Sequence, residues 1–117
     1  MSTAKFNQWP NSDGTENYKC RAWVNFNGTG TVAIRASGNV SSITDNGAGD
    51  YTVNFTTAMP DANYSIGYMT DEAAGGVPVT YLNGGVARTA SSFRMYVYSL
   101  GSAAFRDPTT VVINVFR

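Results

Sequence analysis

The sequence predicts an all-β fold, an antiparallel β-sandwich or jelly roll built from seven or eight short strands. Short runs in which apolar and polar residues alternate predict strands with one buried face. Turn-forming residues separate these runs about every 8–12 residues, a spacing typical of such folds. No window keeps the period of a helix, and no repeat occurs at the spacing of a solenoid.

The chain divides into a polar extension and one domain. Residues 1–18 are polar and aperiodic, and we expect an N-terminal extension that reaches the fold or a neighbouring subunit. Residues 19–117 carry the alternation and form the predicted β-sandwich domain. A chain of 117 residues buries about two-thirds of its unfolded surface, which is enough for a core without disulfides or metal.

Asn-Gly pairs mark the expected hairpins. Both residues of such a turn need positive φ, which asparagine and glycine tolerate best. The pairs begin at Asn27, Asn46 and Asn83. The third is expected to join a strand at residues 77–82 to a partner at residues 86–90.

The alternation also assigns residues to the core. The first strand is expected to bury Cys20, and the second is expected to bury Ile34 and Ala36. Gly38 then marks a bulge or bend. Residues 111–116 are apolar on both faces, which is typical of a strand in the middle of a sheet or at a subunit interface. The other residues expected in the core are Ala22, Val24, Phe26, Val32, Tyr51, Val53, Phe55, Phe93, Met95 and Val97.

Composition excludes several classes of function. Eight basic and eight acidic residues give a net charge of zero without a run of either sign, so the cationic surface of a nucleic-acid-binding protein is missing. No apolar stretch approaches the ~20 residues that span a bilayer, so no membrane insertion is expected. The sequence contains no histidine and one cysteine, which removes Ser-His and Cys-His pairs and zinc sites. We therefore expect no enzyme, no cofactor and no metal.

Acidic residues offer two weaker alternatives. Residues 45–50 carry oxygen ligands that suit calcium, but the same residues suit a turn with positive φ. Asp71 and Glu72 form an acidic pair that could join Asp61 or Asp107 as the carboxylates of a glycosidase. Adjacent carboxylates in a loop are usually only solvated, and the structural alternative is preferred for both sites.

Aromatic residues lie on strand faces opposite the core. Trp23, Tyr96 and Tyr98 are in the outward phase of their strands. Such rings provide either a platform for a sugar ring or protein partner, or a contact with an identical neighbour in a symmetric oligomer. The second alternative gives Trp23, Val112 and Phe116 as candidate oligomer-interface residues.

One segment resembles a known group of proteins. Residues 19–65 contain CRAWVNF at 20–26, NGTG at 27–30, VAIRAS at 32–37 and AMPD at 58–61. This segment, about two-fifths of the chain, resembles a module near the carboxyl ends of tail-fibre and other structural proteins of tailed bacteriophages. The resemblance implies a location in the virion and a homotrimer. The residues after Ser65 resemble no known module.

Three functional hypotheses follow from the resemblance and the residues. The first is a tail-fibre tip or adhesin that attaches to a host cell-surface receptor, a glycan or a protein, through loops at residues 70–77, 83–85 and 100–107. The second is a purely structural virion protein, a capsid decoration or baseplate component, whose partners are other virion proteins. The third is a carbohydrate-active enzyme, which the missing histidine disfavours. The candidate binding residues are Asp71, Asn83, Tyr96, Tyr98, Phe105 and Arg106.

Overall fold

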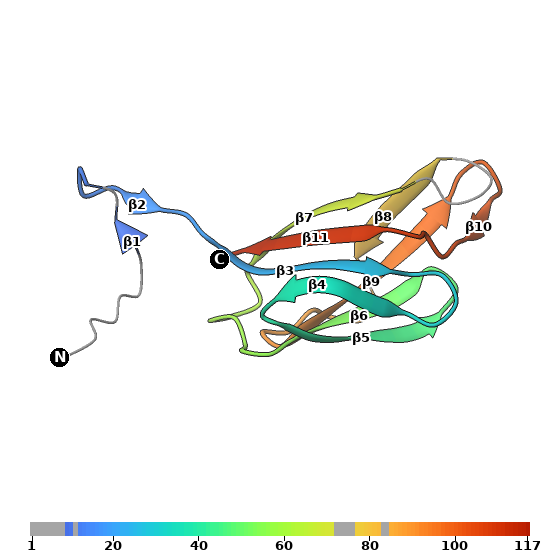
Figure 1. The fold of residues 1–117 in the computed structure, drawn as a ribbon, viewed down its shortest axis with the longest axis horizontal. Coiled ribbons are helices and arrows are strands. Elements are labelled where there is room, and N and C mark those ends of the chain that lie inside the picture. The colour runs from blue at the N-terminus through green and yellow to red at the C-terminus, as the bar shows by residue number, and fades with distance from the viewer. Residues whose placement is uncertain (1–8, 11, 72–76, 83–84) are drawn as a thin grey trace.

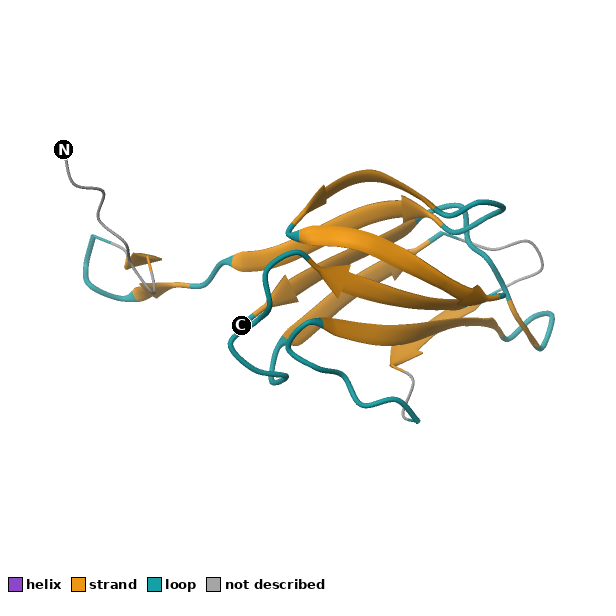
Figure 2. Cartoon of the chain, turned by 90° about the horizontal axis from the view of Figure 1, so that it is seen from below, coloured by secondary structure: helices purple, strands orange, loops and turns teal. Residues whose placement is uncertain are grey.

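The structure is a computed structural model that describes residues 9–10, 12–71, 77–82 and 85–117. Within these residues all regular elements are strands, joined by turns and loops (Figure 2). The described part of the chain holds no helix long and apolar enough to cross a membrane.

Two antiparallel sheets face each other (Figure 1). The β3 sheet has the order β4 (Ala33–Gly38), β3 (Cys20–Asn27), β11 (Val111–Phe116) and β7 (Ser65–Thr70). The β9 sheet contains β5 (Val40–Gly47), β6 (Asp50–Phe55), β8 (Pro78–Leu82), β9 (Ser92–Ser99) and β10 (Ala104–Phe105). The predicted antiparallel β-sandwich is confirmed, with nine strands in its two sheets.

The order of strands in the β9 sheet follows from shared partners on β9. Both β6 and β8 pair with Met95 and Tyr96, so they lie on opposite sides of β9. β10 pairs with Tyr98 and Ser99, which also pair with β8, so β10 lies on the same side as β6. β8 is therefore an edge strand.

The core lies between the sheets and is made by alternate residues of four strands. Burial alternates strictly from Ala22 to Phe26 in β3 and from Val111 to Val115 in β11, and the same pattern runs through β6 and β9. Aromatic rings meet edge to face across it, with 5.3 Å between the ring centroids of Phe26 and Tyr51. The expected core residues of these strands are confirmed: Ala22, Val24, Phe26, Tyr51, Val53, Phe55, Phe93, Met95 and Val97. Val32 lies just before β4 and is only partly buried against the core.

The last strand occupies the middle of its sheet, as its two apolar faces predict. β11 pairs with β3 along one side and with β7 along the other. Its inward residues are buried, whereas Val112 is half-buried and Phe116 is exposed on the outward face.

The predicted bend at Gly38 is the point where the chain changes sheets. β4 ends at Gly38 in the β3 sheet, and β5 begins two residues later in the β9 sheet. Asn39 adopts a φ of 56° between them. Its side-chain amide donates to the carbonyls of Arg21 and Thr57, and its oxygen accepts from the Thr57 N–H at 2.7 Å. This crossing closes one side of the sandwich.

The first two hairpins exist, but positive φ matches the prediction at one residue only. It occurs at Gly47, as predicted, and also at Gly30 and Gly49, but not at Asn27 or Asn46. Because Asn27 accepts hydrogen bonds from the N–H and hydroxyl of Thr29, its side chain shapes the turn without a left-handed backbone.

Gly28 is needed for space and not for its φ. A Cβ at Gly28 would lie 2.5 Å from the hydroxyl of Tyr51 and 2.8 Å from the carbonyl of Pro108. The predicted positive φ at Gly28 was therefore wrong, and the constraint on this glycine is close approach to a buried phenol.

The third predicted hairpin is wrong. β8 pairs with β9, from Pro78 opposite Ser99 to Leu82 opposite Met95, and residues 86–90 form no strand. Arg88 instead donates to the carbonyl of Tyr64, and Thr89 donates to Ser92. β9 is longer and carries several core residues, and pairing with it satisfies the hydrogen bonds of more backbone N–H and C=O groups of β8.

Three predicted core residues are exposed. Cys20 lies at the start of β3, before the facing sheet covers it, and its thiol donates to the carbonyl of Ala22. Ile34 and Ala36 lie on β4, an edge strand whose register shifts between them. Because this bulge interrupts the alternation, neither phase of β4 faces the core continuously.

A small hairpin precedes the sandwich. β1 (Trp9–Pro10) pairs with β2 (Glu16–Asn17) within the predicted polar extension. Figure 1 shows this hairpin standing apart from the two sheets.

Candidate functional site

Four aromatic rings touch one another on the outward face of the β9 sheet. Tyr81 comes from β8, Tyr96 and Tyr98 from β9, and Phe105 from β10. The ring centroids are 5.4 Å apart for Tyr81 and Tyr96, 5.2 Å for Tyr96 and Phe105, and 5.3 Å for Tyr98 and Phe105. We call these four residues the aromatic row.

Strand pairing brings the row together. Tyr81 lies directly opposite Tyr96, and Phe105 lies directly opposite Tyr98. Cross-strand pairs of this kind stabilise a sheet, and tilted or edge-to-face rings add about 0.5–1.5 kcal/mol each. Tyr81 and Phe105 remain 43% and 42% exposed, so the row combines fixed geometry with contact area open to solvent.

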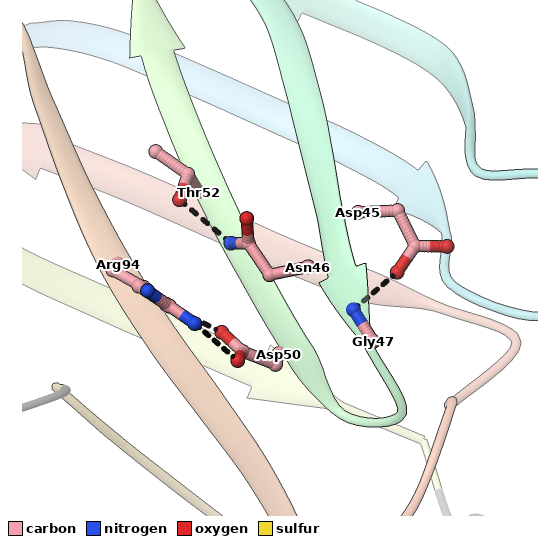
Figure 3. Close-up of polar contacts among 6 residues, drawn as sticks. All are labelled: Asp45, Asn46, Gly47, Asp50, Thr52 and Arg94. Carbon is pink, nitrogen blue, oxygen red and sulfur yellow. Dashed lines mark hydrogen bonds and ion pairs between the residues drawn. The ribbon is translucent and has the colours of Figure 1, made fainter.

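An ion pair lies beside the row. Asp50 is opposite Tyr96 in the register and accepts two hydrogen bonds from Arg94, at 2.8 Å from Nε and 2.6 Å from the terminal nitrogen (Figure 3). This bidentate contact lowers the pKa of Asp50 and raises the pKa of Arg94, so both groups are charged at neutral pH. The side chains are partly buried, which holds the fork of donors and acceptors in one orientation.

Amide and hydroxyl groups continue this surface across β6 and β5. The amide of Asn46 donates to the hydroxyl of Thr52 at 2.8 Å (Figure 3). The amide of Asn54 donates to the hydroxyls of Ser42 and Thr44. The outward face of the β9 sheet therefore changes from the aromatic row on β8, β9 and β10 to an ion pair between β9 and β6, and then to neutral polar groups on β6 and β5.

Such a face suits a polyhydroxylated ligand. Aromatic faces cover the apolar C–H surface of a sugar ring, and amides, carboxylates and guanidinium groups bond its hydroxyls. The row and the ion pair beside it thus offer stacking surface and hydrogen-bonding groups for binding.

Three of the six predicted binding residues meet in the row: Tyr96, Tyr98 and Phe105. Arg106 follows Phe105 at the end of the row, and its Nε donates to the hydroxyl of Ser102. Asp71 lies elsewhere, at the end of β7, where it accepts from the hydroxyl of Thr109 and the N–H of Thr110. Asn83 lies outside the described residues.

Sequence reasoning missed Tyr81 and the pair of Arg94 and Asp50. Tyr81 was assigned to a hairpin with residues 86–90, and only its true pairing with β9 places it against Tyr96. The outward phase of Arg94 was visible in the alternation, but its partner across the sheet was not.

The carboxylates considered for catalysis that the structure describes are each held by a structural partner. Asp61 forms a bidentate pair with Arg117, which lowers the pKa of that carboxyl. Asp107 accepts from the hydroxyl of Tyr51 and the N–H of Gly49, and so ties loops together. Glu72 lies outside the described residues.

The candidate calcium loop forms a hairpin turn. Asp45 accepts from the N–H of Gly47, and Asp50 binds Arg94 (Figure 3). Across the ranges that the structure describes, no three His, Cys, Asp or Glu residues gather to hold a metal ion.

The candidate interface residues share the outward face of the other sheet. Trp23 lies opposite Asn114, which shares the outward phase of β11 with Val112 and Phe116. Met69 on β7 lies opposite Val112. Trp23, Met69 and Phe116 are exposed, so this face presents apolar surface on the side of the sandwich away from the aromatic row.

Comparison of the chain with protein-family models, curated proteins and solved structures found no match.

Proposed function

We propose that this protein is a tail-fibre tip or adhesin-like protein of a bacteriophage virion that attaches to a glycan receptor on the host cell. The aromatic row is the observation that carries the proposal, because it presents preorganised stacking surface beside fixed polar groups. The resemblance of residues 19–65 to phage tail-fibre modules supplies the biological setting.

In this proposal the two outward faces have different roles. The β3 sheet, with Trp23, Met69 and Phe116, forms the contact between the subunits of a homotrimer. The aromatic row on the opposite face stays accessible in each subunit. Three weak sugar contacts on one particle give firm attachment through avidity.

A second function rests on the same apolar face. Exposed Trp23, Met69 and Phe116 also suit contact with another virion protein, as in a capsid decoration or baseplate component. In that case the aromatic row only stabilises the β9 sheet and binds nothing.

Binding to an array of bacterial surface polysaccharides tests the proposal. Phe105→Ala and Tyr81→Ala each remove one exposed ring of the row, and each is expected to weaken binding by at least about tenfold, or ~1.4 kcal/mol. Tyr18→Ala is the matched control, since Tyr18 is an exposed tyrosine outside the row. Absence of binding to any polysaccharide and to intact host cells would leave the structural function in place of the receptor-binding one.

A further inference from the structure

A pocket of about 310 Å³ opens between the two sheets at the edge formed by β7 and β8. Its floor is made of buried core residues, among them Phe93, Met95 and Ile113. Its volume is at the lower end of the roughly 300–1,000 Å³ typical of small-molecule sites. Tyr81 of the aromatic row also lines this pocket, whereas the other three residues of the row do not, so the pocket and the row are neighbouring sites.

The pocket exists because the sandwich is open on this side. Tyr68 is opposite Ile113 and Leu82 is opposite Met95, so both occupy inward positions of their strands. They are nevertheless 54% and 42% exposed. Inward-facing residues of β7 and β8 therefore line a gap between the sheets instead of meeting across it.

Thr80 has an unsatisfied hydroxyl in the wall of this gap. The side chain lines the pocket and is only 8% exposed. Its Oγ1 has no hydrogen-bond partner among the described residues. A buried hydroxyl without a partner costs stability, and a turn of the Thr80 side chain towards the pocket would let a ligand oxygen provide the missing bond.

Arg88 supplies the charge. It is the one charged residue among the described lining residues. Its guanidinium donates to the carbonyl of Tyr64 at 2.9 Å and lies 5.1 Å from the centroid of the Tyr64 ring. These contacts fix the cation at the pocket wall, where it favours an anionic group.

We propose that this pocket binds a small amphiphilic carboxylate, such as a medium-chain fatty acid. The carboxylate pairs with Arg88 and accepts from Thr80, because a planar carboxylate matches the guanidinium fork. The chain lies against Ile66, Phe93 and Ile113, where it replaces water on apolar surface. Only Tyr81 is shared with the row, and none of the residues assigned to the carboxylate or to its chain belongs to the row, so this inference does not rest on the proposed function.

Titration with decanoate below its micelle concentration, followed by calorimetry, tests the proposal in the full chain. Saturable binding and a raised melting temperature are expected for the wild type. Decanol, which lacks the charge, is expected to bind at least about tenfold more weakly. Absence of saturable decanoate binding, or equal binding of decanol, would overturn the assignment.

Variants locate the site. Arg88→Gln and Thr80→Val are each expected to weaken decanoate binding at least about tenfold, whereas Arg21→Gln, an exposed arginine outside the pocket, leaves it unchanged. Thr80→Val keeps the shape of the side chain and removes the unsatisfied hydroxyl, so the melting temperature of this variant should stay level or rise while its affinity for decanoate falls.

If Arg88→Gln does not fold, Ile66→Trp, which fills the pocket, provides the second variant. Unchanged decanoate affinity in Thr80→Val and Ile66→Trp would contradict the site. A wild-type dimer that dissociates when decanoate is added would also contradict it, because a second copy of the chain would then be the natural occupant of the gap.

Discussion

Gly30 and Gly49 have nearly the same left-handed backbone, with φ of 61° and 60°, but different surroundings. A Cβ at Gly30 would meet nothing within 4 Å, whereas one at Gly49 would run into the backbone of Val97 and Arg106. Gly30→Ala should therefore cost only the strain of positive φ, about 1–2 kcal/mol. Gly49→Ala adds a clash with backbone that cannot rotate away and should cost clearly more. Urea unfolding of both variants measures the difference, and equal shifts of the midpoint would contradict this account.

Tyr51 makes the fold sensitive to alkali. Burial, as the largest cause, and the hydrogen bond to Asp107, as the second, raise the pKa of the Tyr51 phenol far above its ordinary value of 10. The unfolded chain ionises above pH 10 while the folded chain keeps the proton, so this stabilisation is complete below pH 10 and is lost as pH rises further.

Unfolding free energy should accordingly fall by up to ~1.4 kcal/mol per pH unit for this phenol above pH 10. Tyr51→Phe removes the ionising group, so its stability should decline less steeply over the same range. Tyr64→Phe should act in the same direction, because burial also raises the pKa of Tyr64. Parallel pH profiles of wild type and Tyr51→Phe in urea unfolding would show that the phenol does not carry the effect.

At the level of elements, pairing on both sides distinguishes β11 from the edge strands. Its backbone bonds to β3 and to β7, whereas β4 and β7 each pair on one side within the described sheet. Amide hydrogens of β11 should exchange only with global unfolding, and those of β4 should exchange through local opening. Hydrogen exchange followed by mass spectrometry or NMR measures this, and comparable protection in β4 and β11 would argue against the strand order.

Periodicity predicted the central strands well and the edge strands poorly, for a physical reason. In β6 and β9, the alternation around Val53 and Val97 is enforced because the opposing sheet covers the whole strand. At Ile34 the strand lies at an edge with a bulge, so its apolar side chain is not forced inward. Alternation within a strand cannot tell how far the facing sheet extends.

The candidate site was predictable only where it lies within one stretch of chain. Tyr96 and Tyr98 are in the outward phase of one strand, and Phe105 follows closely in sequence. Tyr81 joins them through a pairing that the nearby turn signal at Asn83 misassigned. Turn residues predict where the chain turns, but the partner of a strand depends on which pairing buries more apolar surface.

For the whole molecule, two opposite outward faces of different chemistry lead to a prediction about assembly. We expect a homotrimer in solution, with a mass three times the 12.5 kDa of the chain, formed through the apolar face of the β3 sheet. Phe116→Asp places a charge on that face and should shift the protein towards monomer without unfolding it. Leu100→Asp, at another exposed apolar residue, is the control. Sedimentation of the wild type as a monomer at micromolar concentration would remove the trimer.

The central place of β11 also sets the order in which the molecule can fold. The hairpin of β5 and β6 joins neighbours in sequence and can close in about 1–10 μs. β3 can pair early with β4, its neighbour in sequence, but its other edge must wait for β11, which lies at the far end of the domain in sequence, so this pairing has high contact order and is slow. Until that moment β3 and β7 each lack the same middle strand, and their open edges can accept a strand from another chain. Refolding yield should therefore fall as the protein concentration rises, with β11 of one copy completing the sheet of another.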